Sequence, residues 1–202
     1  ILLQRQWMIV RDDRCVLFAD SVVPKDPSGS PRGAEIRYDC RFPLASSITV
    51  DPEPETRDVF LCDGKRRGLV MPISASEWRL GASPATLKGT DDGHLVLSAR
   101  GTHRLNVPLW FDFQQRRFKR KRTWRQLTVA DELRIVKPSE AVGYRIQVGS
   151  QQWMVYRSLG ESTCRSVLGK HLVADFFSAR FDPSDGSLEE LVTVDENDLI
   201  DV

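Results

Sequence analysis

Hydrophobic and polar residues alternate along most of this chain, with the two-residue period of half-buried β-strands. In 34–42 every second residue from Ala34 to Phe42 is apolar, and the residues between them are charged. Segments 142–148 and 173–181 follow a similar pattern. Shorter runs of the same kind occupy 4–11, 14–23, 57–62, 66–73, 93–99, 103–111, 124–129, 151–158 and 188–194. The chain is therefore predicted to consist of many short strands with almost no helix.

Turn-forming residues separate these strands. Asp12-Asp13, Asp63-Gly64 and Gly149-Ser150 predict tight hairpin turns, and the proline-rich segments 24–31 and 51–54 predict loops. Many short strands joined in this way are typical of two stacked antiparallel sheets. We therefore predict an all-β fold, a large antiparallel two-sheet β-sandwich that extends over 1–202 as a single domain.

The composition is typical of a globular chain and argues against a membrane-spanning one. Of the 202 residues, 41% are hydrophobic and 28% are charged, which is close to globular averages. No stretch approaches the ~18 consecutive apolar residues of a membrane span, so no membrane partner is expected. The chain begins inside an apolar run without an initiator Met or a signal-peptide layout, and we expect a fragment of a longer chain. No compartment is predicted.

The cysteines leave two alternatives open. None of the four belongs to a C-x-x-C pair, and each lies in an apolar segment, as buried thiols do: Cys15, Cys40, Cys62 and Cys164. If 14–23 and 33–42 formed a hairpin, Cys15 would lie close to Cys40, and a cross-strand disulfide would imply an oxidising compartment. Two buried thiols are the favoured interpretation.

Catalytic motifs are missing from the sequence. His94, His103 and His171 have no partner at motif spacing, and the chain contains no nucleophile elbow, phosphate-binding loop or zinc-protease motif. We therefore assign no catalytic residue, no metal ligand and no cofactor, and expect no enzyme activity from the chain in isolation. The alternative is a lyase or hydrolase site formed only in three dimensions, with His103 or His171 beside Tyr144 or Tyr156.

The most unusual segment is QQRRFKRKRTWRQ, residues 114–126, which is rich in basic residues and contains no acid. As one extended strand, 116–125 would expose cations on both faces. Guanidinium groups suit sulfate, carboxylate and phosphate, and aromatic rings stack on sugars or bases. The candidate polyanion-binding residues are Arg116, Arg117, Lys119, Arg120, Lys121, Arg122, Trp124 and Arg125.

A second interpretation of the basic run competes with polyanion binding. Segment 182–202 contains no Lys or Arg, and eight acidic residues in it could cover the run: Asp182, Asp185, Glu189, Glu190, Asp195, Glu196, Asp198 and Asp201. Basic residues also protect exposed sheet edges from aggregation. We favour intramolecular pairing or edge protection over an external polyanion, with docking on another domain as a third alternative. The formal net charge of +1 disfavours nucleic acid.

The tryptophans divide into predicted core and predicted surface residues. Trp7 and Trp153 lie in strongly apolar strands and are predicted to be buried, whereas Trp78 lies near a loop and is predicted to be exposed. Stacking of a sugar on Trp78 or Trp124 is an alternative role for these two rings.

The N-terminal strands carry a resemblance to a known family. Residues 4–11, QRQWMIVR, followed by 15–22, CVLFADSV, resemble a pattern in the β-rich C-terminal region of heparinase II/III-like polysaccharide lyases. Arg5, Trp7 and Asp20 are the matching positions, within about twenty residues of the chain. The resemblance implies a sandwich that follows a helical toroid (a supersandwich). It transfers no active-site residue, because the family's catalytic groups come largely from the helical part.

Together these features predict a non-catalytic β-sandwich module of a larger carbohydrate-active protein. We expect the module to pack on another domain of the parent chain and to contact acidic polysaccharide. The alternatives are part of a polysaccharide lyase or hydrolase, and binding of a polyanion or nucleic acid through 116–125.

Overall fold

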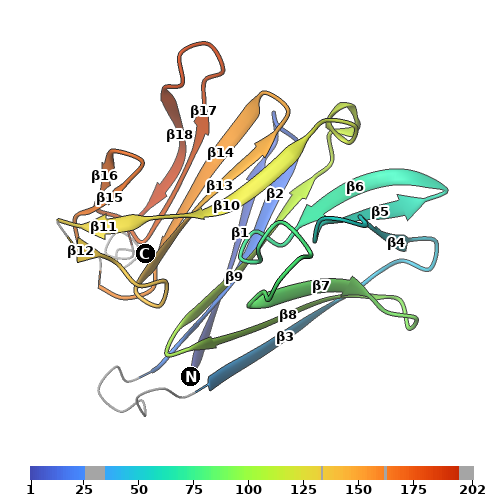
Figure 1. The fold of residues 1–202 in the computed structure, drawn as a ribbon, viewed down its shortest axis with the longest axis horizontal. Helices are drawn as coiled ribbons and strands as arrows, with labels where there is room; N and C mark the ends of the chain where they lie inside the picture. The colour runs from blue at the N-terminus through green and yellow to red at the C-terminus, as the bar shows by residue number, and fades with distance from the viewer. Residues whose placement is uncertain (26–34, 133, 162, 196–202) are drawn as a thin grey trace, which may run out of the picture. The chain divides into compact units, whose positions relative to one another are not determined.

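The computed structural model describes residues 1–25, 35–132, 134–161 and 163–195 (Figure 1). Within these residues there are eighteen β-strands and one short 3-10 helix, Gln115–Arg117. The prediction of an all-β fold with very little helix is confirmed. No helix in the described part is long and apolar enough to cross a membrane. The chain forms two compact units, 1–120 and 121–202. The expected single domain and two-sheet sandwich stay predictions.

The first unit contains a six-stranded and a three-stranded antiparallel sheet. The larger sheet has the order β1 (Leu2–Val10), β2 (Cys15–Val23), β9 (Leu105–Asp112), β6 (Lys65–Met71), β5 (Val59–Asp63), β4 (Thr49–Pro52). The smaller sheet has the order β3 (Glu35–Pro43), β8 (His94–Thr102), β7 (Ala85–Gly89). Both sheets contribute to one core, which includes Phe18 and Val22 of β2, Tyr38 of β3 and Leu97 of β8.

The second unit contains a five-stranded and a four-stranded antiparallel sheet. The larger sheet has the order β10 (Arg122–Leu127), β13 (Ala141–Val148), β14 (Gln151–Ser158), β17 (Phe176–Phe181), β18 (Leu188–Val194). The smaller sheet has the order β12 (Arg134–Ile135), β11 (Val129–Asp131), β15 (Arg165–Val167), β16 (Lys170–Leu172). Their shared core includes Leu127 and Tyr156 from the larger sheet and Val167 and Leu172 from the smaller one.

Each predicted strand segment contains a strand, and all three predicted hairpin turns are present. Gly64 and Gly149 adopt φ angles of +64° and +63°, which glycine reaches without strain. Segment 51–54 was predicted as a loop, but Asp51 and Pro52 pair with β5. Proline is tolerated there because β4 is an edge strand. Strand β7 was not predicted, and neither were the short strands β12, β15 and β16. Most of the predicted 24–31 loop lies outside the described residues.

The proposed hairpin between 14–23 and 33–42 is wrong. Strand β2 pairs with β1 and β9, whereas β3 pairs with β8 in the other sheet. Cys15 is buried, Cys40 is half-buried, and both thiols are free, as are Cys62 and Cys164. Because β2 and β3 belong to different sheets, Cys15 and Cys40 do not lie opposite each other on paired strands, and no cross-strand disulfide forms.

Candidate functional site

The basic run is not a single strand. Its first part folds into two tight turns, in which the N–H of Arg117 donates to the carbonyl of Gln114 and the N–H of Arg120 donates to the carbonyl of Arg117, both at 2.8 Å. Strand β10 begins only at Arg122. The single extended strand considered for 116–125 therefore does not form, and Arg117 is buried whereas Arg116 and Lys119 are exposed.

Arg117 lies inside the first unit. Its Nε donates to Asp112 Oδ2 at 2.7 Å, and its Nη2 donates to Asp112 Oδ1 at 2.8 Å. Nη2 also contacts Cys15 Sγ at 3.1 Å and the carbonyl oxygen of Asp13. Burial disfavours the charged guanidinium, but Asp112, together with Cys15 and Asp13, outweighs this effect, and the pKa of Arg117 is raised. Arg117 is thus a structural residue that cannot reach an external polyanion.

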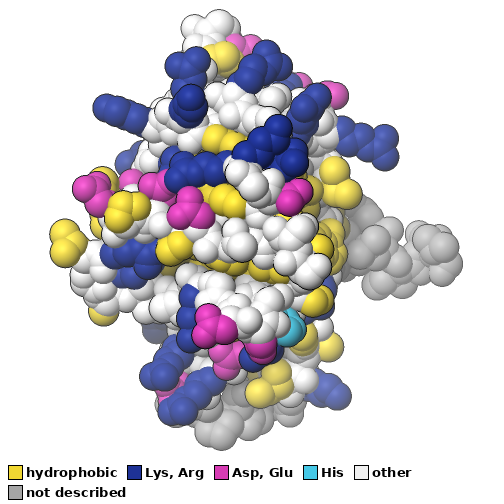
Figure 2. All heavy atoms as spheres, turned by 90° about the vertical axis from the view of Figure 1, so that its right-hand side faces the viewer, with side chains coloured by type: hydrophobic (Ala, Val, Ile, Leu, Met, Phe, Trp, Pro, Cys, Tyr) yellow, Lys and Arg dark blue, Asp and Glu magenta, His cyan; other side chains and the backbone are white. Residues whose placement is uncertain are grey.

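The aromatic residues of the run are also buried. Phe118 packs edge-on against Phe60, with ring centroids 5.5 Å apart, and Trp124 is only 2% exposed. Neither ring is available to stack on a sugar or base, so the stacking role considered for Trp124 is wrong. The exposed cations of the run are Arg116, Lys119, Arg120, Lys121 and Arg125. Figure 2 shows a face on which Lys and Arg side chains are numerous and Asp and Glu side chains are interspersed.

The described part of the acidic segment does not cover β10. Strand β10 forms one edge of its sheet and β18 forms the other, with three strands between them. On β18, Glu189 accepts from Nη2 of Arg180 on the neighbouring strand at 2.6 Å. Residues 196–202 lie outside the described residues. The edge position of β10 agrees with edge protection by its cations.

Two arginines lie directly opposite each other on β10 and β13. Arg125 is paired in register with Arg145, and Thr123 is paired with Gln147. Opposite residues of an antiparallel pair project from the same face, and like charges in this position repel. Among the described residues neither guanidinium is paired with a carboxylate. The pair therefore forms a concentrated, uncompensated positive charge.

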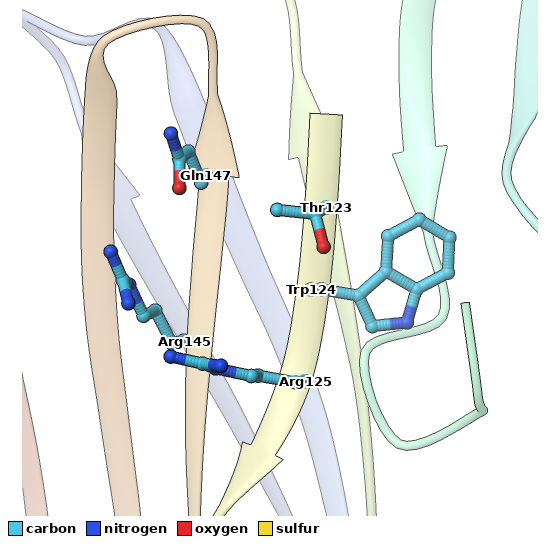
Figure 3. Close-up of a pocket in the computed structure, with 5 residues that line it drawn as sticks. All are labelled: Thr123, Trp124, Arg125, Arg145 and Gln147. Atoms are coloured by element: carbon cyan, nitrogen blue, oxygen red, sulfur yellow. The ribbon is translucent and has the colours of Figure 1, made fainter. Parts of the chain in front are cut away.

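These side chains line a cavity of about 130 Å³, together with Trp124 (Figure 3). Figure 3 shows the Arg125 side chain extending across β13 towards Arg145. Nε of Arg145 donates to Gln152 Oε1 at 2.9 Å, Nη2 donates to the same oxygen, and the guanidinium lies over the ring of Phe181. Arg145 is thus held in place, whereas Arg125 is exposed. Such a pair of guanidinium groups is suited to a carboxylate, sulfate or phosphate group.

The sequence identified Arg125 but missed Arg145 and Gln147. Both lie at outward positions of a correctly predicted strand, where an isolated Arg or Gln is unremarkable. Only the pairing register of β10 with β13 brings them beside Arg125. No signal within either strand specifies that register.

The three residues behind the family resemblance lie close together on β1 and β2, and of the three only Asp20 is buried. Arg5 and Asp20 are opposite residues of β1 and β2, and Tyr38 reaches Asp20 from β3 of the other sheet. Trp7 packs edge-on against Phe18, with ring centroids 4.8 Å apart, but it is 56% exposed because β1 is an edge strand. The prediction of a buried Trp7 is therefore wrong.

The predictions of a buried Trp153 and an exposed Trp78 are confirmed. Trp153 is fully buried, and Trp78 is 53% exposed.

A larger open cavity of about 580 Å³ lies in the first unit, with lining residues from β4, β7 and the loops beside them. Its lining includes Arg79 and Lys88 but contains no aromatic ring, so it offers no stacking platform for a sugar.

The histidines show no metal site. His94 begins β8, with Nδ1 3.2 Å from Asp92 Oδ1, and His171 lies exposed on β16. Within the described residues, no group of three His, Cys, Asp or Glu side chains is placed to hold a metal ion. Tyr144 and Tyr156, considered as partners for a histidine, are buried.

The fold and the cavity define an all-β protein with a guanidinium pair formed by exposed Arg125 on the edge strand β10 and half-buried Arg145 on the neighbouring strand β13. Comparisons with protein-family models, curated proteins and solved structures return no match to this chain. The resemblance to heparinase II/III-like lyases therefore stays a prediction.

Proposed function

We propose that this chain is a non-catalytic β-rich module of a larger carbohydrate-active protein, and that it binds acidic groups of a polysaccharide between Arg125 and Arg145. The observation that carries the proposal is the direct opposition of two guanidinium groups without a carboxylate partner among the described residues. A bound carboxylate or sulfate group would remove their mutual repulsion and accept hydrogen bonds from both.

The surroundings of the pair favour a glycan over a nucleic acid. Thr123 and Gln147 line the cavity with a hydroxyl and an amide; the Gln147 amide nitrogen donates to the carbonyl of Gly149 at 3.0 Å, and polar groups of this kind are suited to sugar hydroxyls. The aromatic residues of the run are buried, so the stacking on which single-stranded nucleic acid binding depends is not available there. A net charge of +1 also gives little long-range attraction for a polyphosphate.

Calorimetric titration with sulfated and uronate oligosaccharides tests the proposal. Hydrogen bonds to charged groups contribute about 1.5–3 kcal/mol each, so Arg125→Gln/Arg145→Gln should weaken binding more than tenfold. The chain offers a matched control, because Arg37 and Arg100 also lie opposite each other, but Glu35 accepts from Arg37 at 3.1 Å. Arg37→Gln/Arg100→Gln should leave the affinity nearly unchanged.

Equal losses in the two double variants would show that general charge, not the cavity, attracts the ligand, and would refute the proposal. Tighter binding of single-stranded DNA than of any oligosaccharide, with affinity that grows with DNA length, would support the nucleic-acid alternative instead.

A further inference from the structure

Strand β1 is an unusually unprotected sheet edge. Exposed edges present unpaired backbone N–H and C=O groups, and proteins usually protect them with charges, proline or short length. The other edge strands of the described sheets follow this rule: β4 has Asp51 and Pro52, β3 has Glu35, Arg37, Asp39 and Arg41, β7 has Lys88, β10 has Arg122 and Arg125, β18 has Glu189 and Glu190, β12 has Arg134 and β16 has Lys170.

Strand β1 lacks this protection. It is nine residues long and contains neither proline nor glycine. Its one charged residue, Arg5, is already paired with Asp20. On the same face as Arg5, the apolar side chains of Leu3, Trp7 and Ile9 are 51%, 56% and 68% exposed. An edge with these properties is suited to pair with another strand.

The sequence of β1 is complementary to itself. Its bounds, Leu2 and Val10, are equidistant from Gln6. A second copy related by a twofold axis through Gln6 would run antiparallel and keep each side chain on its own face. Leu2 would then lie opposite Val10 of the second copy, and Leu3 would lie opposite Ile9. Every residue of the strand would be paired.

The charge pattern selects this register over its neighbours. Pairing about Gln6 places the Arg5 guanidinium opposite the Trp7 ring of the second copy, a favourable cation–π arrangement. Pairing about Arg5 would place two guanidinium groups opposite each other, which is destabilising. Pairing about Trp7 would place Leu3 opposite Arg11, so an apolar contact would be lost.

We propose that this protein forms a symmetric dimer in which β1 pairs with β1 of a second copy about Gln6. The pairing joins two six-stranded sheets into one and covers the exposed faces of Leu3, Trp7 and Ile9. One strand pair buries less area than a standard interface of about 800 Å² per partner, so the dimer is reversible and depends on concentration.

Engineered cysteines test the register. Opposite residues of an antiparallel pair have Cα atoms about 4.5–5.5 Å apart, which is within the range that a disulfide spans. In a Cys164→Ser background, which removes the exposed thiol, Gln6→Cys should form a covalent dimer under mild oxidation. Gln4→Cys and Met8→Cys should each fail alone and crosslink when mixed, because position 4 lies opposite position 8. Equal crosslinking of all three single variants would refute the register.

A charge exchange tests the dimer itself without crosslinking. Sedimentation of the wild-type chain from about 1 to about 200 µM should show a monomer–dimer equilibrium. Leu3→Lys/Ile9→Lys opposes like charges and should give a monomer, whereas Leu3→Lys/Ile9→Glu opposes unlike charges and should restore the dimer. Circular dichroism checks that both variants fold. A wild-type chain that stays monomeric throughout this range would overturn the proposal.

Discussion

Arg5 and Asp20 form a bidentate ion pair between β1 and β2. Nε of Arg5 donates to Asp20 Oδ1 and Nη2 donates to Oδ2, both at 2.9 Å, and Tyr38 Oη donates to Oδ2 at 2.6 Å. The Asp20 side chain is fully buried, whereas that of Arg5 is 48% exposed. Asp20 raises the pKa of Arg5, and the pKa of Tyr38 is raised by burial and by Asp20. The buried carboxylate thus holds strands of both sheets together.

Asp20→Asn should destabilise the protein markedly. It removes the negative charge and leaves Arg5 and Tyr38 with weaker partners, and loss of one partner of a buried ion pair costs about 3–5 kcal/mol. Because Arg5 is half exposed to solvent, we expect about 2 kcal/mol, measured by urea unfolding. Tyr38→Phe should cost about 1 kcal/mol. Glu35→Gln serves as the control, because it removes one partner of an exposed ion pair. If Asp20→Asn lowers the free energy of unfolding no more than Glu35→Gln does, the contacts of Asp20 with Arg5 and Tyr38 contribute little to stability.

Two neighbouring arginines of the basic run should behave in opposite ways. Arg117→Ala leaves Asp112 buried without its guanidinium partner and should lower the free energy of unfolding by about 3 kcal/mol. Arg116→Ala removes an exposed side chain and should change it by less than about 0.5 kcal/mol. Urea unfolding of both variants measures the difference. Similar stabilities would contradict the buried position of Arg117.

Strand positions could be predicted because alternation is a local property. In 34–42 the pattern identified Tyr38 as a core residue without knowledge of its neighbours, and Tyr38 is buried. Trp7 was assigned wrongly because burial depends on whether a strand is central or at an edge. That property is set by sheet order, which the sequence of one strand does not contain.

The candidate site depends even more on contacts between strands, which the sequence of one segment does not reveal. The positive charge of 116–125 was visible, but the partners of Arg117 at Asp13 and Cys15 are distant in the sequence. They convert an apparent surface cation into a buried one. In contrast, Arg145 became part of the site only through its register with Arg125. Which cations are free for a ligand is thus a tertiary property.

The four thiols should react at very different rates. A disulfide-exchange reagent such as Ellman's reagent should modify Cys164 first, because its side chain is exposed. Cys15 should react only on unfolding, because burial blocks access and raises its thiol pKa. Cys40 and Cys62 are half-buried and should be intermediate, with burial also raising the pKa of Cys62. Fewer than four thiols in the denatured chain would contradict the finding that all four are free.

A substitution at Gln152 can test anion binding without a loss of stability. Its Oε1 accepts from Arg145, so Gln152→Glu places a carboxylate where the amide oxygen orients the guanidinium. The new charge should pair with Arg145 and keep or increase stability, yet it should compete with the ligand and weaken oligosaccharide binding more than tenfold.

The matched control for Gln152→Glu is Gln126→Glu, which adds the same charge to β10 at an exposed position on the other face of the sheet from Arg125. Gln126→Glu should leave the affinity for the oligosaccharide within about twofold of wild type, because salt screens an exposed charge on the opposite face of the sheet. Calorimetric titration and urea unfolding of both variants give the two readouts. If Gln152→Glu binds the oligosaccharide as tightly as Gln126→Glu does, Arg145 takes no part in binding. A loss confined to Gln152→Glu at unchanged stability assigns the anion to the cavity between Arg125 and Arg145.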